Sequence, residues 1–218
     1  MRKSLSLAAV AAAATSAVLA LPATSAFAAG HVLTITKTGG TAVKVGAVLK
    51  SGLAKGKTAT FSLGTEKLTC KSASFTAKVT ANPAKPGTAT ESLTAQSFAK
   101  CTVNVTGVTV KSIKVNNLPY KVSVSDASGH PVAITGSSSS KPVKVTVNVA
   151  LGTTNVTCSY TATTVKGTSS NTGSTITFSK QKFAKSSGAL CPAAATFSAV
   201  FGPVKDTSVT GSPAVFVN

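Results

Sequence analysis

An eight-residue motif occurs twice in the chain and fixes where the cysteines lie. LGTEKLTC spans residues 63–70 and LGTTNVTC spans residues 151–158, so the two copies are 88 residues apart. Each copy is followed by one of two related segments, QSFAK directly before Cys101 and QKFAK shortly before Cys191. The chain is therefore an internal duplication in which each repeat carries two cysteines.

The four cysteines predict two disulfides, because cysteines in an exported chain are usually paired. Three pairings are possible, and all three respect the duplication. Proximity favours Cys70–Cys101 and Cys158–Cys191, since each bond then closes within its own repeat. By chain entropy each bond would stabilise the fold by roughly 3–4 kcal/mol. Cysteines spaced this widely, without a CxxC pair, argue against a zinc site.

The first residues have the pattern of a Sec-type signal peptide. Arg2 and Lys3 precede an alanine-rich apolar run over residues 5–21, and AFA at residues 26–28 is a small-x-small cleavage site. The apolar run is short for a membrane span, which needs roughly 20 residues. We expect cleavage after residue 28 and a secreted, extracellular product without a transmembrane segment.

Alternation of apolar and polar residues dominates the rest of the chain and predicts β-strands. Four valines in residues 143–149 alternate with lysine, threonine and asparagine, and residues 120–125 alternate in the same way. Turn-forming residues separate such segments. The pattern predicts an all-β fold, specifically a duplicated antiparallel β-sandwich of the immunoglobulin-like type with one disulfide per repeat.

Two architectures satisfy the duplication. One has two tandem immunoglobulin-like sandwiches, over residues 29–126 and 127–218, and the other is a single pseudo-twofold double sheet. The tandem arrangement is favoured because a repeat of roughly 90 residues has a marginal core, which its own disulfide would support.

The chain beyond the signal peptide is strongly basic. Removing Arg2 and Lys3 lowers the formal net charge from +18 to +16, and every remaining basic residue is a lysine. Such a field attracts anionic surfaces, although lysines also form the polar half of alternating strands and protect sheet edges. Sequence-specific nucleic-acid binding is not expected, since arginine and tryptophan are missing. Binding to polyanions would be non-specific and strongly salt-dependent.

Groups capable of acid–base chemistry are scarce. They are Glu66, Glu91, Asp126, Asp206, His31 and His130. No GxSxG, phosphate-binding loop, HExxH or calcium-loop pattern is present. Glu66 lies where the second motif has Thr154, which is more typical of a solvated turn than of a diverged site. We therefore predict no enzyme activity, no catalytic residue, no cofactor and no metal site.

Phenylalanines mark the expected core. Most lie in predicted strands, namely Phe75, Phe98, Phe178, Phe183, Phe197, Phe201 and Phe216. Phe98 and Phe183 occupy matching positions in the two repeats, which favours core packing over the alternative, a ligand cavity lined by these rings.

The alanine-rich signal peptide, the Thr/Ser/Val/Gly/Lys-rich body and the few cysteines resemble small exported proteins of actinobacteria. Composition and cysteine count are also similar to the neocarzinostatin-type apoproteins, immunoglobulin-like sandwiches with two disulfides that hold an apolar chromophore. This chain departs from them in being duplicated and basic, whereas those carriers are single-domain and acidic.

The leading hypothesis from the sequence is a secreted, non-enzymatic structural or binding module. Its lysine-rich surface would contact anionic envelope or extracellular polymers, such as teichoic acid, extracellular DNA or phospholipid head groups. The alternative is a carrier that holds a small apolar ligand in a cleft between sheets, and it predicts a cavity lined by the phenylalanines.

Overall fold

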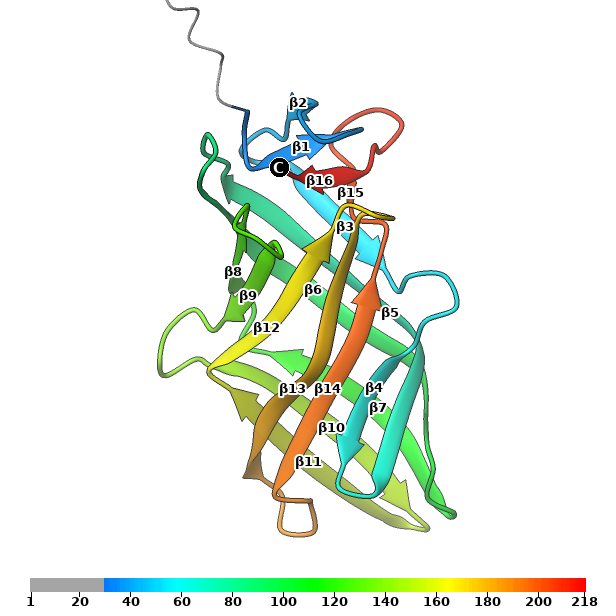
Figure 1. Ribbon diagram of the computed structural model, residues 1–218. Helices are drawn as coiled ribbons and strands as arrows, with labels where there is room; N and C mark the ends of the chain where they lie inside the picture. Colours follow the sequence, from blue (N-terminus) through cyan, green and yellow to red (C-terminus); the bar gives the residue numbers. More distant parts are fainter. Residues whose placement is uncertain (1–29) are drawn as a thin grey trace, which may run out of the picture.

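The computed structural model describes residues 30–218, so the predicted signal peptide lies outside the described residues. This range contains sixteen β-strands and no helix (Figure 1). The all-β prediction is confirmed.

The long strands lie where the sequence alternates. The strands are β1 (Leu33–Ile35), β2 (Thr41–Ala42), β3 (Val48–Gly52), β4 (Ala59–Leu63), β5 (Glu66–Ala81), β6 (Thr88–Val103), β7 (Val108–Asn116), β8 (Tyr120–Ser125), β9 (Pro131–Thr135), β10 (Val143–Leu151), β11 (Thr154–Ala162), β12 (Thr164–Ser170), β13 (Thr175–Ser187), β14 (Ala194–Phe201), β15 (Lys205–Asp206) and β16 (Val215–Val217).

Eight strands close into a barrel. They follow the order β12-β9-β8-β6-β5-β4-β14-β13, and a further pairing of β12 with β13 completes the ring. The structure therefore differs from the predicted immunoglobulin-like sandwiches. Alternation specifies which face of each strand points inward, but it does not specify which strands pair across the sheet.

A second group of strands extends the barrel along its axis. The first half of β13 pairs with β12, whereas its last residues pair with β11, from which β10 and β7 continue the sheet. A single residue, Thr163, separates β11 from β12. In Figure 1 the strands β7, β10 and β11 accordingly lie in the lower half of the molecule, and β7 is an edge of the sheet.

The two repeats exchange strands. The first motif forms the β4–β5 hairpin and the second forms the β10–β11 hairpin. Strand β14 from the second repeat pairs with β4, and β7 from the first repeat pairs with β10. Strands of both repeats therefore belong to one 13-stranded sheet.

Each disulfide stays within its own repeat. Cys70 is bonded to Cys101 between β5 and β6, and Cys158 is bonded to Cys191 in the loop after β13. Both predicted pairings are confirmed, and two disulfides are typical of an oxidising environment such as the cell exterior.

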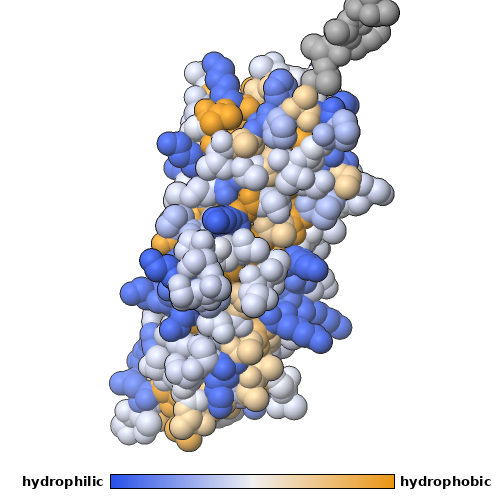
Figure 2. All heavy atoms as spheres, turned by 90° about the vertical axis from the view of Figure 1, so that its left-hand side faces the viewer, coloured by the Kyte–Doolittle hydropathy of each residue, from blue (hydrophilic) through white to orange (hydrophobic). Residues whose placement is uncertain are grey.

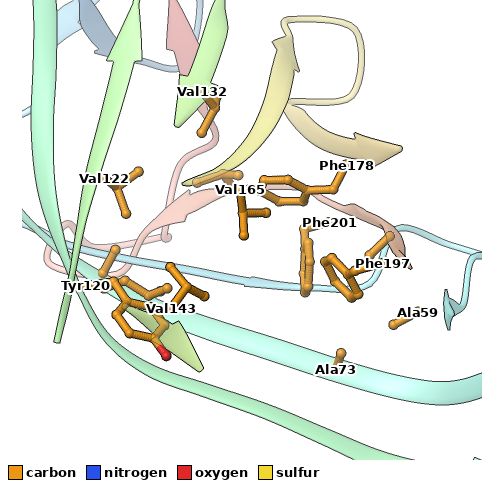
Figure 3. Packing of buried hydrophobic residues seen from close by; sticks show 14 of the residues in the cluster. Ala59, Ala73, Tyr120, Val122, Val132, Val143, Val165, Phe178, Phe197 and Phe201 are labelled. Carbon is orange, nitrogen blue, oxygen red and sulfur yellow. The ribbon is translucent and has the colours of Figure 1, made fainter. Parts of the chain in front are cut away.

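Aromatic rings fill the centre of the barrel. The ring of Phe197 lies 4.9 Å from that of Phe61 and 6.1 Å from that of Phe178, measured between ring centroids. Figure 3 shows Phe178, Phe197 and Phe201 side by side, with Tyr120 and Val143 to their left in the same core. The two voids among these rings hold about 30 Å³ each, roughly one water molecule, so the phenylalanines pack a core.

The two ends of the molecule differ. Strands β16, β1 and β2 form a small second sheet at the upper end in Figure 1, where the C-terminus also lies. Asn82 holds this sheet, because its side-chain amide bonds the backbone of both Leu33 and Val43. The lower end has no such sheet and is formed by the tips of hairpins (Figure 1).

Candidate functional site

A cavity of about 410 Å³ opens at the lower end of the molecule. Its lining is apolar except for one acid and one tyrosine. The lining residues are Leu63, Glu66, Leu68, Val103, Val105, Val108, Val147, Val149, Leu151, Val156, Cys158, Tyr160, Leu190 and Pro192. This volume lies in the range of small-molecule sites, whereas each void in the aromatic core is the size of one water.

The duplicated motif builds two opposing parts of the wall. Its leading leucines, Leu63 and Leu151, both line the cavity, and so does the matched pair Leu68 and Val156. Each leucine is followed by a glycine at positive φ, +74° at position 64 and +57° at position 152, which lets the chain reverse into the next strand. The duplication thus places equivalent side chains on two sides of one cavity.

The inward-facing side chains of β10 extend from the aromatic core to the open end of the cavity, which we call the mouth. Val143 and Val145 border the void in the aromatic core, and Val147, Val149 and Leu151 line the cavity. Because side chains alternate along a strand, the intervening polar residues face outward. The valines whose alternation predicted this strand therefore also form part of the cavity wall.

The inner end of the cavity is closed by the aromatic core. Phe197, Phe61, Leu68 and Val103 lie in one row across β14, β4, β5 and β6. The two phenylalanines border the core void, whereas Leu68 and Val103 line the cavity. The cavity is consequently a cup that is closed toward the core and open at the hairpin tips.

Two leucines at the mouth are exposed to solvent. Leu151, at the start of the β10–β11 turn, is 52% exposed, and Leu190, in the β13–β14 loop, is 75% exposed. Leucines usually lie inside proteins, and these two mark the edge of an apolar cavity.

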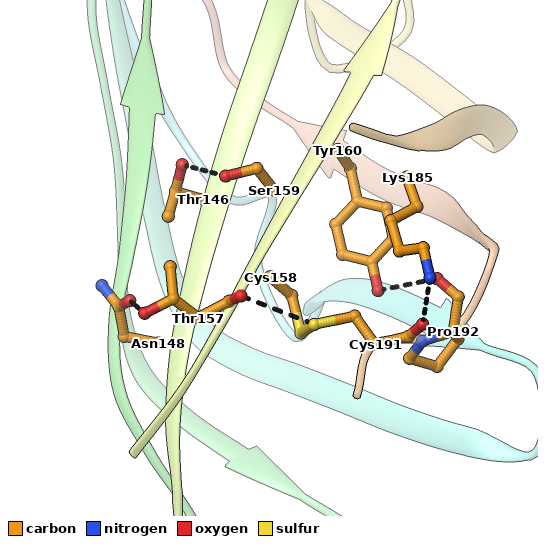
Figure 4. The surroundings of a disulfide bond; sticks show 9 residues. All are labelled: Thr146, Asn148, Thr157, Cys158, Ser159, Tyr160, Lys185, Cys191 and Pro192. Carbon is orange, nitrogen blue, oxygen red and sulfur yellow. Dashed lines mark hydrogen bonds between the residues drawn. A yellow bond between two sulfur atoms is a disulfide. The ribbon is translucent and has the colours of Figure 1, made fainter. Parts of the chain in front are cut away.

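The β13–β14 loop that carries Leu190 is fixed in three ways (Figure 4). The Cys158–Cys191 disulfide ties it to β11. The Lys185 ammonium donates to the Cys191 carbonyl at 3.0 Å, and the Tyr160 hydroxyl donates to the Pro192 carbonyl at 3.3 Å. The mouth is therefore preorganised on the side of this loop.

Two polar groups lie among the apolar lining. Burial, and then the negative charge of Glu66, raise the pKa of the Tyr160 hydroxyl, so the phenol stays protonated at neutral pH. Glu66 itself is half-buried at the β4–β5 turn and accepts a hydrogen bond from the Thr65 hydroxyl at 3.3 Å. A ligand in the cup could therefore meet one hydroxyl and one carboxylate.

The structure separates the other acids. Glu91 faces the barrel interior, where burial raises its pKa to about 7. Asp126 accepts from the backbone N–H of Gly87, and buried Asp206 accepts from that of Ser208. The two histidines lie apart from the cavity, His31 in an isolated bridge to Ala84 and His130 in the turn before β9.

Two further features of residues 30–218 bear on the site. No group of three or more histidine, cysteine, aspartate or glutamate side chains in this range is placed to hold a metal ion. Nor does this part of the chain contain a helix long and apolar enough to cross a membrane.

Sequence reasoning missed the composition of the cavity. It expected a ligand cleft to be lined by phenylalanines, but the lining contains none and consists mainly of valine and leucine. The available signal was the leading leucine of each motif, which the duplication places at two hairpin turns, together with Leu190 near Cys191. The pairing of the four cysteines, by contrast, was predicted correctly from the sequence.

Comparison with known proteins gives no assignment. No protein-family model, no curated protein and no solved structure matches this chain. The function is therefore inferred from the cavity and from the surface of the molecule.

Proposed function

We propose that this protein binds a small apolar ligand in the cup at its lower end. One observation carries the proposal: an apolar cavity of about 410 Å³ is closed by the aromatic core and opens between two exposed leucines. An apolar molecule gains free energy by leaving water for such a site, in proportion to the area it buries. The role is that of a non-enzymatic carrier, and the signal-peptide pattern supports an extracellular location for it.

The polar groups suggest the form of the ligand. The long walls of valine and leucine suit a hydrocarbon or ring system, and one end of the ligand would lie near the Tyr160 hydroxyl and the Glu66 carboxylate. A few placed polar groups in an otherwise apolar pocket typically fix the orientation of a ligand. A ligand with a hydroxyl or amine at one end satisfies both groups.

Titration with a neutral environment-sensitive fluorophore, N-phenyl-1-naphthylamine, tests the proposal. Val149→Trp fills the cup, and Val156→Phe is a second filling variant on the neighbouring strand. Lys111→Trp adds the same ring to an exposed position of β7 and is the matched control. We expect saturable binding to the wild type and to the control, and at least tenfold weaker binding to both filled variants.

Circular dichroism establishes that each variant keeps its strands. Absence of saturable probe binding to the wild type would overturn the proposal. Equal probe affinity in the wild type and in both filled variants would do the same, because the probe would then bind elsewhere.

A second function, contact with anionic envelope polymers, is supported by the placement of the acids. Glu91 and Asp206 are buried, and Asp126 is bonded to a backbone N–H, whereas most of the twenty lysines are exposed. The outer surface is consequently more uniformly positive than the composition alone indicates. Retention on immobilised teichoic acid at low salt is expected, and a column that retains no protein would refute this second proposal.

A further inference from the structure

We propose that the open end of the cup docks on an anionic lipid bilayer, with Leu151 and Leu190 inserted among the lipid head groups. The proposal goes beyond ligand binding, because it depends on the outer surface of the mouth and not on what fills the cavity. It also assigns a source to an apolar ligand, which would pass from the bilayer into the cup.

The apolar part of the surface is the pair of leucine tips. In residues 30–218 four large hydrophobic side chains are exposed, and the two leucines among them lie at the same end. The other two, Val45 and Val209, line a separate hollow beside Asp206 at the opposite end. Exposed apolar residues at the tips of rigid turns can enter a lipid interface, where their burial is favourable.

The charged part of the surface is a set of lysines beside the mouth. Lys67 directly follows Glu66 at the β4–β5 turn, and the Lys185 ammonium bonds the carbonyl of Cys191 in the mouth loop. Lys100 and Lys111 each lie three residues from the cavity-lining ends of β6 and β7, which is about 10 Å along a strand. All four are exposed.

These lysines match an anionic bilayer in both position and sign. Basic residues near the surface of an anionic membrane are each attracted to it, and the attraction reaches about one Debye length, roughly 8–10 Å. The one acid at this end, Glu66, is half-buried in the cavity wall. Figure 2 shows hydrophobic atoms reaching the surface at the lower end, below hydrophilic residues along the sides.

Two other occupants fit less well. A second copy docked mouth to mouth would bring the same lysines together, and like charges oppose that contact. An anionic polymer would bind lysines anywhere on the surface and would gain nothing from exposed leucines. Of the three, only an anionic bilayer offers favourable contacts to both the leucines and the lysines. A docked bilayer would also lie directly at the opening of the apolar cavity.

Flotation with lipid vesicles tests the docking. Leu151→Ser with Leu190→Ser removes the tips, and Val45→Ser with Val209→Ser removes the two exposed valines at the other end as the matched control. On phosphatidylglycerol-containing vesicles at low salt, we expect the leucine variant to bind at least tenfold more weakly than the wild type. The valine variant should bind like the wild type, and phosphatidylcholine vesicles should bind all three weakly.

A single-site fluorophore reports which end touches the lipid. Because the chain has no tryptophan, Leu190→Trp and Val209→Trp each introduce one probe. Brominated anionic lipids should quench the indole fluorescence of the Leu190→Trp protein and leave that of the Val209→Trp protein unchanged. Equal quenching of the two proteins would overturn the proposed orientation.

The remaining outcomes are also decisive. Equal vesicle binding by the leucine and valine variants would show that the lysine field acts alone, and would overturn the docking proposal. So would a wild-type dimer that is lost in the leucine variant while vesicles stay unbound, since the tips would then be a self-association surface. The cup-filling variant Val149→Trp separates the two proposals, because it should lose the apolar probe and still bind vesicles.

Discussion

Glu91 is a buried acid that should make the stability of the protein depend on pH. It lies in β6 between Ala89 and Leu93 on the inward face, and its neighbours across the sheet are Val79 and Val122. The residue is 8% exposed, and burial raises the pKa of its carboxyl from 4.5 to about 7. An ionised carboxylate is therefore disfavoured inside the barrel.

The sign of the pH dependence follows from this shift. Below about pH 4.5 the carboxyl is protonated in both the folded and the unfolded chain, and it does not oppose folding. Between about pH 4.5 and 7 only the unfolded chain ionises, so the free energy of unfolding falls as the pH rises. A shift of this size amounts to about 3 kcal/mol, and the loss is complete above pH 7.

Urea unfolding of Glu91→Gln checks the magnitude. The amide has the same shape and does not ionise, so the variant should be about 3 kcal/mol more stable than the wild type at pH 8 and similar to it at pH 4. Circular dichroism follows the transition, because the chain has no tryptophan. The other acids are the same in both proteins, so the difference between the two curves isolates Glu91.

Glu66→Gln is the control for this experiment. Glu66 is the half-buried acid at the mouth, and its replacement leaves Glu91 in place. The control should therefore keep the wild-type decline in stability between pH 4.5 and 7. Parallel curves for wild type and Glu91→Gln, or a Glu91→Gln protein that is less stable at pH 8, would refute the reasoning.

Two further regions give predictions. Phe197→Ala removes the ring that contacts three other phenylalanines and should lower the free energy of unfolding by about 3–5 kcal/mol in urea; a loss below about 1 kcal/mol would contradict the packing. The disulfides close loops of 31 and 33 residues. The double variants Cys70→Ala/Cys101→Ala and Cys158→Ala/Cys191→Ala should therefore each lower the free energy of unfolding by roughly 3–4 kcal/mol. The second pair alone should also weaken binding of the apolar probe, because it frees the mouth loop; equal probe binding by both pairs would argue against that role.

Local signals in the sequence predicted local structure well. Alternation predicted strands at residues 120–125 and 143–149, which lie in β8 and β10. These features depend on neighbouring residues only, so a single sequence contains them.

The closure of the barrel and the cavity at the lower end could not be predicted in the same way. The pairing of β12 with both β9 and β13 closes the ring, and the alternation of apolar and polar residues does not by itself specify which strands pair. The sequence does not reveal the cavity either. Val147 and Val149 alternate with polar residues in the same way whether their side chains pack against others or border open space. Glu91 likewise looks like an ordinary strand residue until its neighbours are known.

The strand exchange between repeats has a consequence for how the chain can be divided. Cutting it near residue 126 would remove β14 from beside β4 and β10 from beside β7, leaving each half with unpaired edges. The two halves supplied as separate chains would offer each other the matching edges, because β4 pairs with β14 and β7 pairs with β10. The strand exchange thus makes the sheet pairing of each repeat depend on the other.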